Sequence, residues 1–251
     1  IDATGNGITV AIAPAPAPTP TPTTETIDGV EVTATTTSTT TTVTDSVTGQ
    51  TTTVATQTVT TTIPIITDTR TEEDVTTPQA DIPLVSDSSG ETIIQASLPV
   101  GVGLTSEAVE TTTSTTLTLR EKLISASELR TERSAFTDIL SKGIDKYVPG
   151  VQDETQVTVR TITFNIAPEQ TSAPTEAIVI SGATGTGESD SNNPNRQEAL
   201  VIDTTNLPSG TVLQLNNVEF AIIIGEVIAT GGNGRNFAVG DGASQYIVLG
   251  E

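Results

Sequence analysis

The chain has 251 residues, of which 34% are hydrophobic and 2% aromatic, with 31 acidic residues against 10 Lys and Arg. Its net charge of −21 repels phosphate backbones and anionic lipid, so nucleic acid is not an expected partner. No run reaches the ~20 apolar residues that span a bilayer, so insertion into a membrane is not expected either. Cys and His are both missing, which excludes Cys-His and Ser-His-Asp catalytic arrangements and metal sites built on these side chains.

Residues 1–22 form the first predicted unit, a short strand followed by a proline-rich extension. Ile8, Val10 and Ile12 alternate with small or polar residues, as in a strand. Residues 13–22 alternate Pro with Ala or Thr, which favours a stiff polyproline II spacer. This arrangement suggests that Ile8, Val10 and Ile12 belong to an exported assembly strand that pairs with the sheet edge of a neighbouring subunit. A disordered tail is the alternative.

Residues 23–80 form the second unit, which is dominated by Thr with interspersed Val and is predicted to be a β-ribbon. Asp28-Gly29 is the dipeptide expected of a two-residue primed hairpin turn. We expect a short strand before it, long strands over residues 30–47 and 51–66, a reversal at 48–50 and a break at Pro64. Where both faces carry Thr, a slip of one residue costs little, so the ribbon is expected to depend on packing against another body or another copy.

Residues 81–230 are predicted to be a β-rich domain with a small two-helix insertion near 117–142. Strands are expected over 81–85, 92–100, 157–164 and 177–180, before a surface loop at 181–196. The helices are expected over 117–129 and 132–142, where apolar residues recur at helical spacing and Gly143 ends the second helix. Short apolar strands between residues 199 and 229 fit either a sandwich core or the rungs of a β-solenoid.

Residues 231–251 begin with two nine-residue units, 231–239 and 240–248, of the form glycine-glycine-x-glycine-x-aspartate-x-apolar-x. In this form the Asp at the sixth place binds Ca²⁺ between stacked turns. Here the sixth places hold the neutral residues Asn236 and Gln245, so calcium is expected to bind weakly or not at all within this chain. Asn233, Asn236 and Asp241 are the candidate metal ligands. Ordinary glycine-rich turns without a metal are the alternative.

The last quarter of the chain resembles a known family. The segments that carry the resemblance are QEALVID at 197–203, LPSGT at 207–211, NVEF at 217–220 and GDGASQYIVLG at 240–250. They look like the stretch that precedes the glycine-rich repeats of large RTX (hemolysin-type calcium-binding) proteins of proteobacteria, and ADIPLV at 80–85 and the Thr-rich leader are similar as well. The resemblance implies type I secretion, an extracellular location and calcium binding mainly in repeats beyond Glu251. It implies no catalytic activity, because such repeats accompany adhesins, surface-layer proteins, toxins and enzymes alike.

Together these features predict a mainly β chain with a structural role. We expect an extracellular, cell-surface protein that self-assembles into a filament, sheath or surface layer, with itself as partner, through strand exchange or ribbon pairing. The alternative is a monomeric adhesin stalk or carrier segment of the RTX type, which would contact a cell surface or glycans. Ice binding by the Thr rows is a weaker alternative, because the Thr runs lack a fixed period.

An enzyme is not expected, because the candidate acids have no suitable surroundings. Asp138, Asp145, Asp153 and Glu154 lie close together in the sequence. They flank a polar turn, without an apolar pocket that would raise the pKa of one carboxyl and prepare it for acid catalysis.

Overall fold

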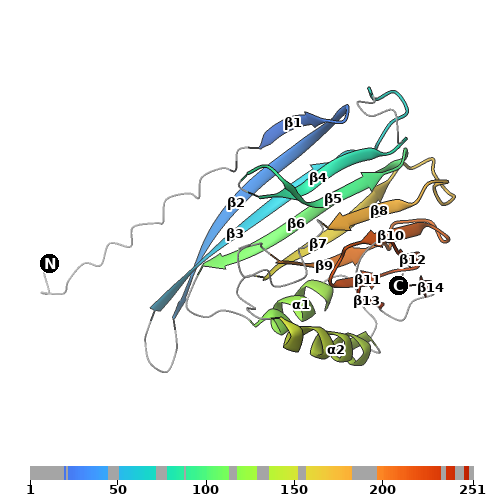
Figure 1. Ribbon diagram of the computed structural model, residues 1–251. Helices are drawn as coiled ribbons and strands as arrows, with labels where there is room; N and C mark the ends of the chain where they lie inside the picture. Colours follow the sequence, from blue (N-terminus) through green and yellow to red (C-terminus); the bar gives the residue numbers. More distant parts are fainter. Residues whose placement is uncertain are drawn as a thin grey trace, which may run out of the picture.

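The computed structural model describes residues 20, 22–44, 51–71, 78–87, 89–112, 118–128, 136–151, 157–182, 197–232, 236–240 and 246–248. These residues form two β-sheets and two α-helices (Figure 1), which confirms the predicted mainly β fold with a two-helix insertion. The eight-stranded sheet has the order β1 (Thr23–Ile27), β2 (Val30–Thr44), β3 (Thr51–Ile63), β6 (Val102–Thr112), β7 (Val157–Ile166), β9 (Gln197–Asp203), β11 (Ala221–Ile224), β13 (Ala238–Gly240). The six-stranded sheet has the order β14 (Tyr246–Val248), β12 (Ile228–Gly231), β10 (Val212–Asn216), β8 (Ile178–Gly182), β5 (Thr92–Leu98), β4 (Ala80–Ser86).

The first part of both sheets is antiparallel. β1, β2, β3, β6 and β7 pair in this order in the eight-stranded sheet, and β4, β5 and β8 do so in the six-stranded sheet. The predicted hairpin turn is confirmed: Ile27 pairs with Val30, and Asp28 and Gly29 have φ angles of 47° and 70°. Positive φ at both central residues is the signature of a type I′ turn, whose twist matches that of the paired strands.

The second part of both sheets is a parallel stack. From β7 onward the chain alternates between the two sheets, and the strands of successive rungs pair in parallel. The spacing between paired residues shortens along the chain: Ile180 pairs with Leu215, whereas Ala229 pairs with Ile247, eighteen residues further on. The strands between residues 199 and 229 therefore match the second of the two expected architectures, solenoid-like rungs, and these rungs continue the antiparallel part of the two sheets. The two nine-residue units contribute β13 and β14, which form the last described rung.

The main core lies between the two sheets. Leu200 and Ile202 of β9 are fully buried there, and Leu213 and Leu215 of β10 meet them from the six-stranded sheet. Alternate residues along each strand face this core, as expected for strands with one face buried. Burial of each such side chain contributes about 1.5–3 kcal/mol relative to exposure.

A second core lies on the other face of the eight-stranded sheet. The helices α1 (Leu119–Glu128) and α2 (Phe136–Tyr147), followed by the 3₁₀ turn η1 (Val148–Gly150), cover the parallel part of that sheet (Figure 1). Leu123 and Ile144 of the helices are fully buried against Val201 of β9 and Phe220 beside β11. The parallel strands β9 and β11 are thus buried on both faces, which explains their nearly continuous apolar sequence. Neither of the two described helices is long and apolar enough to cross a membrane.

The prediction that Gly143 ends the second helix is wrong. α2 continues to Tyr147, because Ile144 extends its apolar face into the second core. Gly143 has a packing role instead: a Cβ atom at this position would lie only 2.4 Å from Cγ2 of Val239 in β13. The missing side chain therefore lets the helix lie close to the last rung of the stack.

Candidate assembly site

One edge of the eight-stranded sheet is covered along only part of its length. β1 pairs with β2 from Ala34 to Val30, whereas β3 pairs with β2 as far as Thr44. Over residues 35–44, no described strand pairs with the outer side of β2. Figure 1 shows β2 and β3 continuing past the end of β1, and their tip, beyond the Thr40–Ala55 pair, projecting beyond β6 as well. We call the outer side of residues 35–44 the open edge.

The open edge lies in the least charged part of a strongly acidic chain. Between Glu31 and Asp68 the sequence has a single charged residue, Asp45, and residues 35–44 read TTTSTTTTVT without Pro, Gly or charge. Natural proteins usually protect sheet edges with charged side chains, Pro or bulges, because the unpaired N–H and C=O groups of an edge can pair with another strand. None of these devices is present along the open edge.

The hairpin turn determines which main-chain groups face the open edge. The residues that flank a two-residue turn form a hydrogen-bonded pair, so the N–H and C=O of Val30 point toward β1. This direction alternates along a strand, and the Ala34 carbonyl accordingly accepts a hydrogen bond from the Thr23 hydroxyl of β1 at 3.3 Å. β2 pairs with both neighbours without a register shift. The main-chain groups of residues 36, 38, 40, 42 and 44 therefore point to the open edge.

The nearby edge of the six-stranded sheet is protected, in contrast. β4 contains Pro83, which has no N–H to offer a further strand. Its register with β5 shifts between Pro83 and Val85 and again between Val85 and Ser86, so the strand is irregular there. Bulges and Pro are the usual means of preventing edge pairing.

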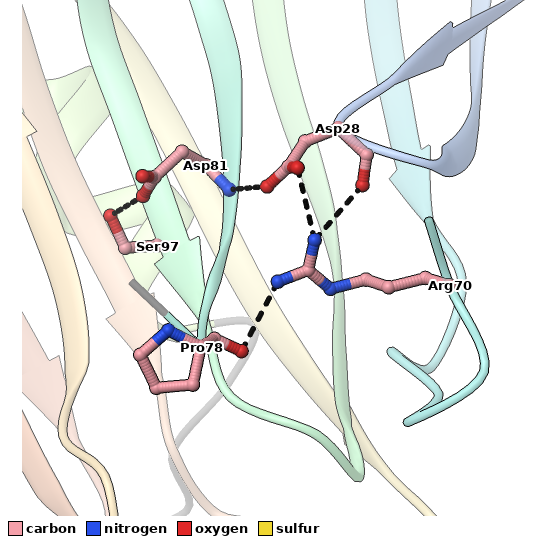
Figure 2. A network of polar contacts seen from close by, with 5 residues as sticks. All are labelled: Asp28, Arg70, Pro78, Asp81 and Ser97. Carbon is pink, nitrogen blue, oxygen red and sulfur yellow. Dashed lines mark hydrogen bonds and ion pairs between the residues drawn. The ribbon is translucent and has the colours of Figure 1, made fainter. Parts of the chain in front are cut away.

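A polar network that we call the root anchor joins the turn between β1 and β2 to β4 (Figure 2). Arg70 donates hydrogen bonds to Oδ1 of Asp28 at 3.0 Å, to the Asp28 carbonyl at 3.2 Å and to the Pro78 carbonyl at 3.1 Å. The Asp81 N–H of β4 donates to Oδ2 of Asp28 at 3.0 Å, and the Ser97 hydroxyl donates to Asp81. The Arg70 and Asp28 side chains are only 5% and 10% exposed. The root anchor thus fixes the β1–β2 hairpin to the six-stranded sheet.

Of the three candidate calcium ligands in the glycine-rich turns, the structure describes only Asn236. Asn236 accepts a hydrogen bond from the Val218 N–H through its side-chain Oδ1, at 2.9 Å. Val218 follows Asn217, whose φ of 51° marks the turn of the preceding rung. The side-chain amide oxygen of Asn236 therefore links two consecutive turns of the stack. Asn233 and Asp241 lie outside the described residues.

Three aromatic rings, those of Tyr147, Phe220 and Phe237, form a stack beside the parallel strands. The Tyr147 and Phe220 rings stack with centroids 4.2 Å apart, and Phe237 follows at 5.7 Å from Phe220. Lys146 Nζ lies 5.8 Å from the centroid of the Phe237 ring. Burial, followed by the negative charge of Glu219, raises the pKa of the Tyr147 hydroxyl far above its usual value. This group is therefore a neutral structural side chain at any ordinary pH.

The charged side chains that the structure describes in the core are paired. Arg160 of β7 and Glu198 of β9 form an ion pair of 3.1 Å, with side chains only 4% and 1% exposed, and Arg160 also donates to the Ser106 hydroxyl of β6 at 3.1 Å. Partners on three adjacent strands satisfy these buried charges. The arrangement is that of a structural pair.

Of the four acidic residues considered for catalysis, the structure describes Asp138 and Asp145, both on α2. Asp145 is exposed on α2 and forms an ion pair with Arg120 at 2.9 Å. Asp138 lies on the same helix, whereas Asp153 and Glu154 lie outside the described residues. Within the described ranges, no three Asp or Glu side chains gather in a group that could hold a metal ion.

The candidate assembly strand with Ile8, Val10 and Ile12 also lies outside the described residues. The site that the structure adds is therefore the open edge, which lies in the predicted ribbon. Comparison of the chain with models of protein families, with curated proteins and with solved structures finds no match.

Proposed function

We propose that this chain is an extracellular structural protein that self-assembles into a filament, sheath or surface layer by pairing of its Thr-rich ribbons. The observation that carries the proposal is the uncharged open edge of β2, residues 35–44. Main-chain groups there that pair with no described strand can bind a further strand as in β-augmentation, and the ladder gains hydrogen bonds without any requirement for side-chain pockets.

The contrast with β4 supports a role for this edge. The same molecule protects the β4 edge with Pro83, irregular pairing and the root anchor, whereas residues 35–44 of β2 carry no charge or Pro and pair with no described strand on their outer side. In the part of the ribbon whose side chains the structure describes, Thr36 and Ser38 on one face and Thr39 on the other are exposed. Thin polar ribbons are only marginally stable alone in water. Pairing with a second ribbon would stabilise both copies.

A monomeric RTX-type adhesin stalk or carrier segment is the second candidate. The observation that favours it is the parallel stack, in which Ile228 of β12 and Tyr246 of β14 pair eighteen residues apart, the length of two nine-residue units. In this role the ribbon is a spacer, a cell surface or glycans are the partners, and calcium binds mainly in repeats beyond Glu251.

The two candidates differ in what one charge on the open edge would do. We expect Ser38→Lys to abolish concentration-dependent assembly, because it places a solvated cation at the pairing edge. Gln57→Lys is the matched control, since Gln57 of β3 is exposed directly opposite Ser38 but lies on an interior strand. Sedimentation and electron microscopy, with and without millimolar calcium, measure assembly.

The proposal predicts polymers of the unsubstituted protein and of Gln57→Lys, and dispersed protein for Ser38→Lys. A protein that stays monomeric at every concentration and in both calcium conditions would overturn self-assembly and favour the stalk. Equal loss of assembly in both variants would show that the open edge is not the contact.

A further inference from the structure

We infer that the partner of the open edge is β2 of a second copy. The two strands pair antiparallel about a two-fold axis that passes between the two copies of Thr40. This inference rests on the proposed function and specifies its contact. It follows from three features of residues 35–44: their number, the direction of their main-chain groups and their lack of charge.

The direction of the main-chain groups fixes which residues can lie opposite each other. In an antiparallel ladder, residues whose N–H and C=O groups face the partner lie in directly opposed, hydrogen-bonded pairs. The groups that face the open edge belong to residues 36, 38, 40, 42 and 44. A two-fold axis at Thr40 places residue 36 opposite 44, residue 38 opposite 42 and residue 40 opposite itself. The five pairs exchange about ten hydrogen bonds and satisfy every outward group of the open edge.

The end of β1 selects this register from its neighbours. Thr23 already pairs with Ala34, so a second strand can start only beyond Ala34. A shift that placed Thr44 of the second copy opposite Ala34 would displace β1. A shift in the other direction would leave the outward groups of Thr36 without a partner from the second β2. The register centred on Thr40 is therefore the longest ladder that the open edge accepts.

Residues 35–44 of a second copy are a better partner for the open edge than an acidic segment of the same protein, because they carry no charge. Two chains of net charge −21 repel each other. Residues 35–44 bring no charge to the contact, and the register opposes none of the acidic side chains of one β2 to those of the other. A two-fold contact is closed and produces a dimer, so growth into a larger assembly needs a further contact elsewhere on the dimer.

Cysteine cross-linking tests the register, because the chain has no Cys and an introduced thiol is unique. Thr40→Cys should form an intermolecular disulfide under mild oxidation, since hydrogen-bonded pairs have Cα atoms ~5.5 Å apart, within disulfide range. Ser38→Cys alone should not, because its own copy across the axis is four residues along the ladder, roughly 14 Å away. A mixture of Ser38→Cys and Thr42→Cys proteins should form the mixed disulfide.

The outcomes separate the register from the proposed function. Assembly with strong cross-linking of Thr40→Cys and of the Ser38→Cys and Thr42→Cys mixture supports both. Assembly in which Thr40→Cys fails to cross-link, while Ser38→Cys cross-links with itself, overturns the register but not the function. Equal self-cross-linking of all three variants indicates parallel pairing and also overturns the inference. Monomers without a cross-link in any variant, each with the circular dichroism spectrum of the unsubstituted protein, overturn both.

Discussion

The two halves of the eight-stranded sheet are held together in different ways. In the parallel half, Leu200 and Ile202 of β9 face the core between the sheets, while Ala199 and Val201 face the helices. In the Thr-rich half, both faces of β2 become exposed beyond the hairpin root, as at Thr36, Ser38 and Thr39. One half is fixed by side-chain packing on two faces, and the other by its main-chain ladder and by contacts at its root.

This difference shows what fixes the register of strands whose side chains are nearly all alike. A ribbon with Thr on both faces can slip in register at low cost. The type I′ turn at Asp28-Gly29 fixes the register of β1 and β2, and the root anchor fixes that turn to β4. The ribbon therefore depends on a few polar contacts, whereas the parallel half depends on close steric fit.

Removal of the Arg70 side chain should have the largest effect on stability. Arg70→Ala leaves the Asp28 carboxylate, only 10% exposed, without its cation. Breaking a buried ion pair by removing one partner costs about 3–5 kcal/mol. We expect a loss of this size in the free energy of unfolding, measured by urea denaturation in the Ser38→Lys background, in which assembly is expected to be lost and should not contribute.

Arg120→Ala is the control for this prediction. The Arg120–Asp145 pair has a similar length of 2.9 Å, but its side chains are 44% and 58% exposed. Exposed pairs contribute about 0–1 kcal/mol, so this variant should unfold almost as the parent does. Similar losses for the two variants would show that the ribbon root does not depend on the buried anchor.

The sequence predicts the turn and the strand end of the ribbon well, but not the residues elsewhere in the chain that hold the ribbon in place. Asp28-Gly29 specifies the turn by backbone conformation alone, and Pro64 ends β3 because it has no N–H to donate. Arg70 has no comparable signal, since its partners lie 42 and 8 residues away along the chain. The anchor depends on the packing of one sheet on the other, which is a tertiary property. The open edge could have been anticipated from the uncharged run, but not which residues β1 leaves uncovered.

Strand β6 shows a second limit of sequence reasoning. No strand is predicted over Val102–Thr112, although β6 joins the ribbon to β7 in the middle of the eight-stranded sheet. Its inward residues include Ser106 and Ala108, which are small and give a weak apolar alternation. Ser106 is buried because it accepts a hydrogen bond from Arg160. Strands β9 and β11 of the parallel stack have a stronger sequence signal, because strands buried on both faces carry continuous apolar runs.

A methyl group at Gly143 should test the steric fit of the parallel half. Propensity alone predicts that Gly143→Ala stabilises α2, because Ala is the better helix former. The added Cβ would lie 2.4 Å from Val239, however, and such overpacking costs about 1–3 kcal/mol. We therefore expect a net decrease in the free energy of unfolding, measured in the same background.

The neighbouring residue gives the matched control for this substitution. Lys142 lies one position earlier on α2 and is exposed, so Lys142→Ala should change stability by no more than about 0.5 kcal/mol. If Gly143→Ala proves more stable than the parent, the helix does not lie close to β13, and the packing account of Gly143 is wrong.

The smallest effect is expected at the start of α1, where a capping box holds the helix over the parallel half. The Thr118 N–H donates to Oε2 of Glu121 at 2.8 Å, and the Glu121 N–H donates to the Thr118 hydroxyl at 3.2 Å. This reciprocal pair satisfies two N–H groups that have no partner within the helix. The Thr118 N–H, followed by the Thr118 hydroxyl, lowers the pKa of Glu121 below its ordinary value of 4.5.

This lowered pKa makes the contribution of Glu121 dependent on pH. A carboxyl whose pKa is lower in the folded chain stabilises it above the unfolded pKa, and this contribution is lost as the pH falls through the folded pKa. The advantage of the parent over Glu121→Gln should therefore be constant at neutral pH and decrease below pH 4.5. Urea denaturation of both proteins across this range measures it. A difference that does not change with pH would mean that the carboxylate charge makes no contribution, and that α1 depends on its contacts in the second core alone.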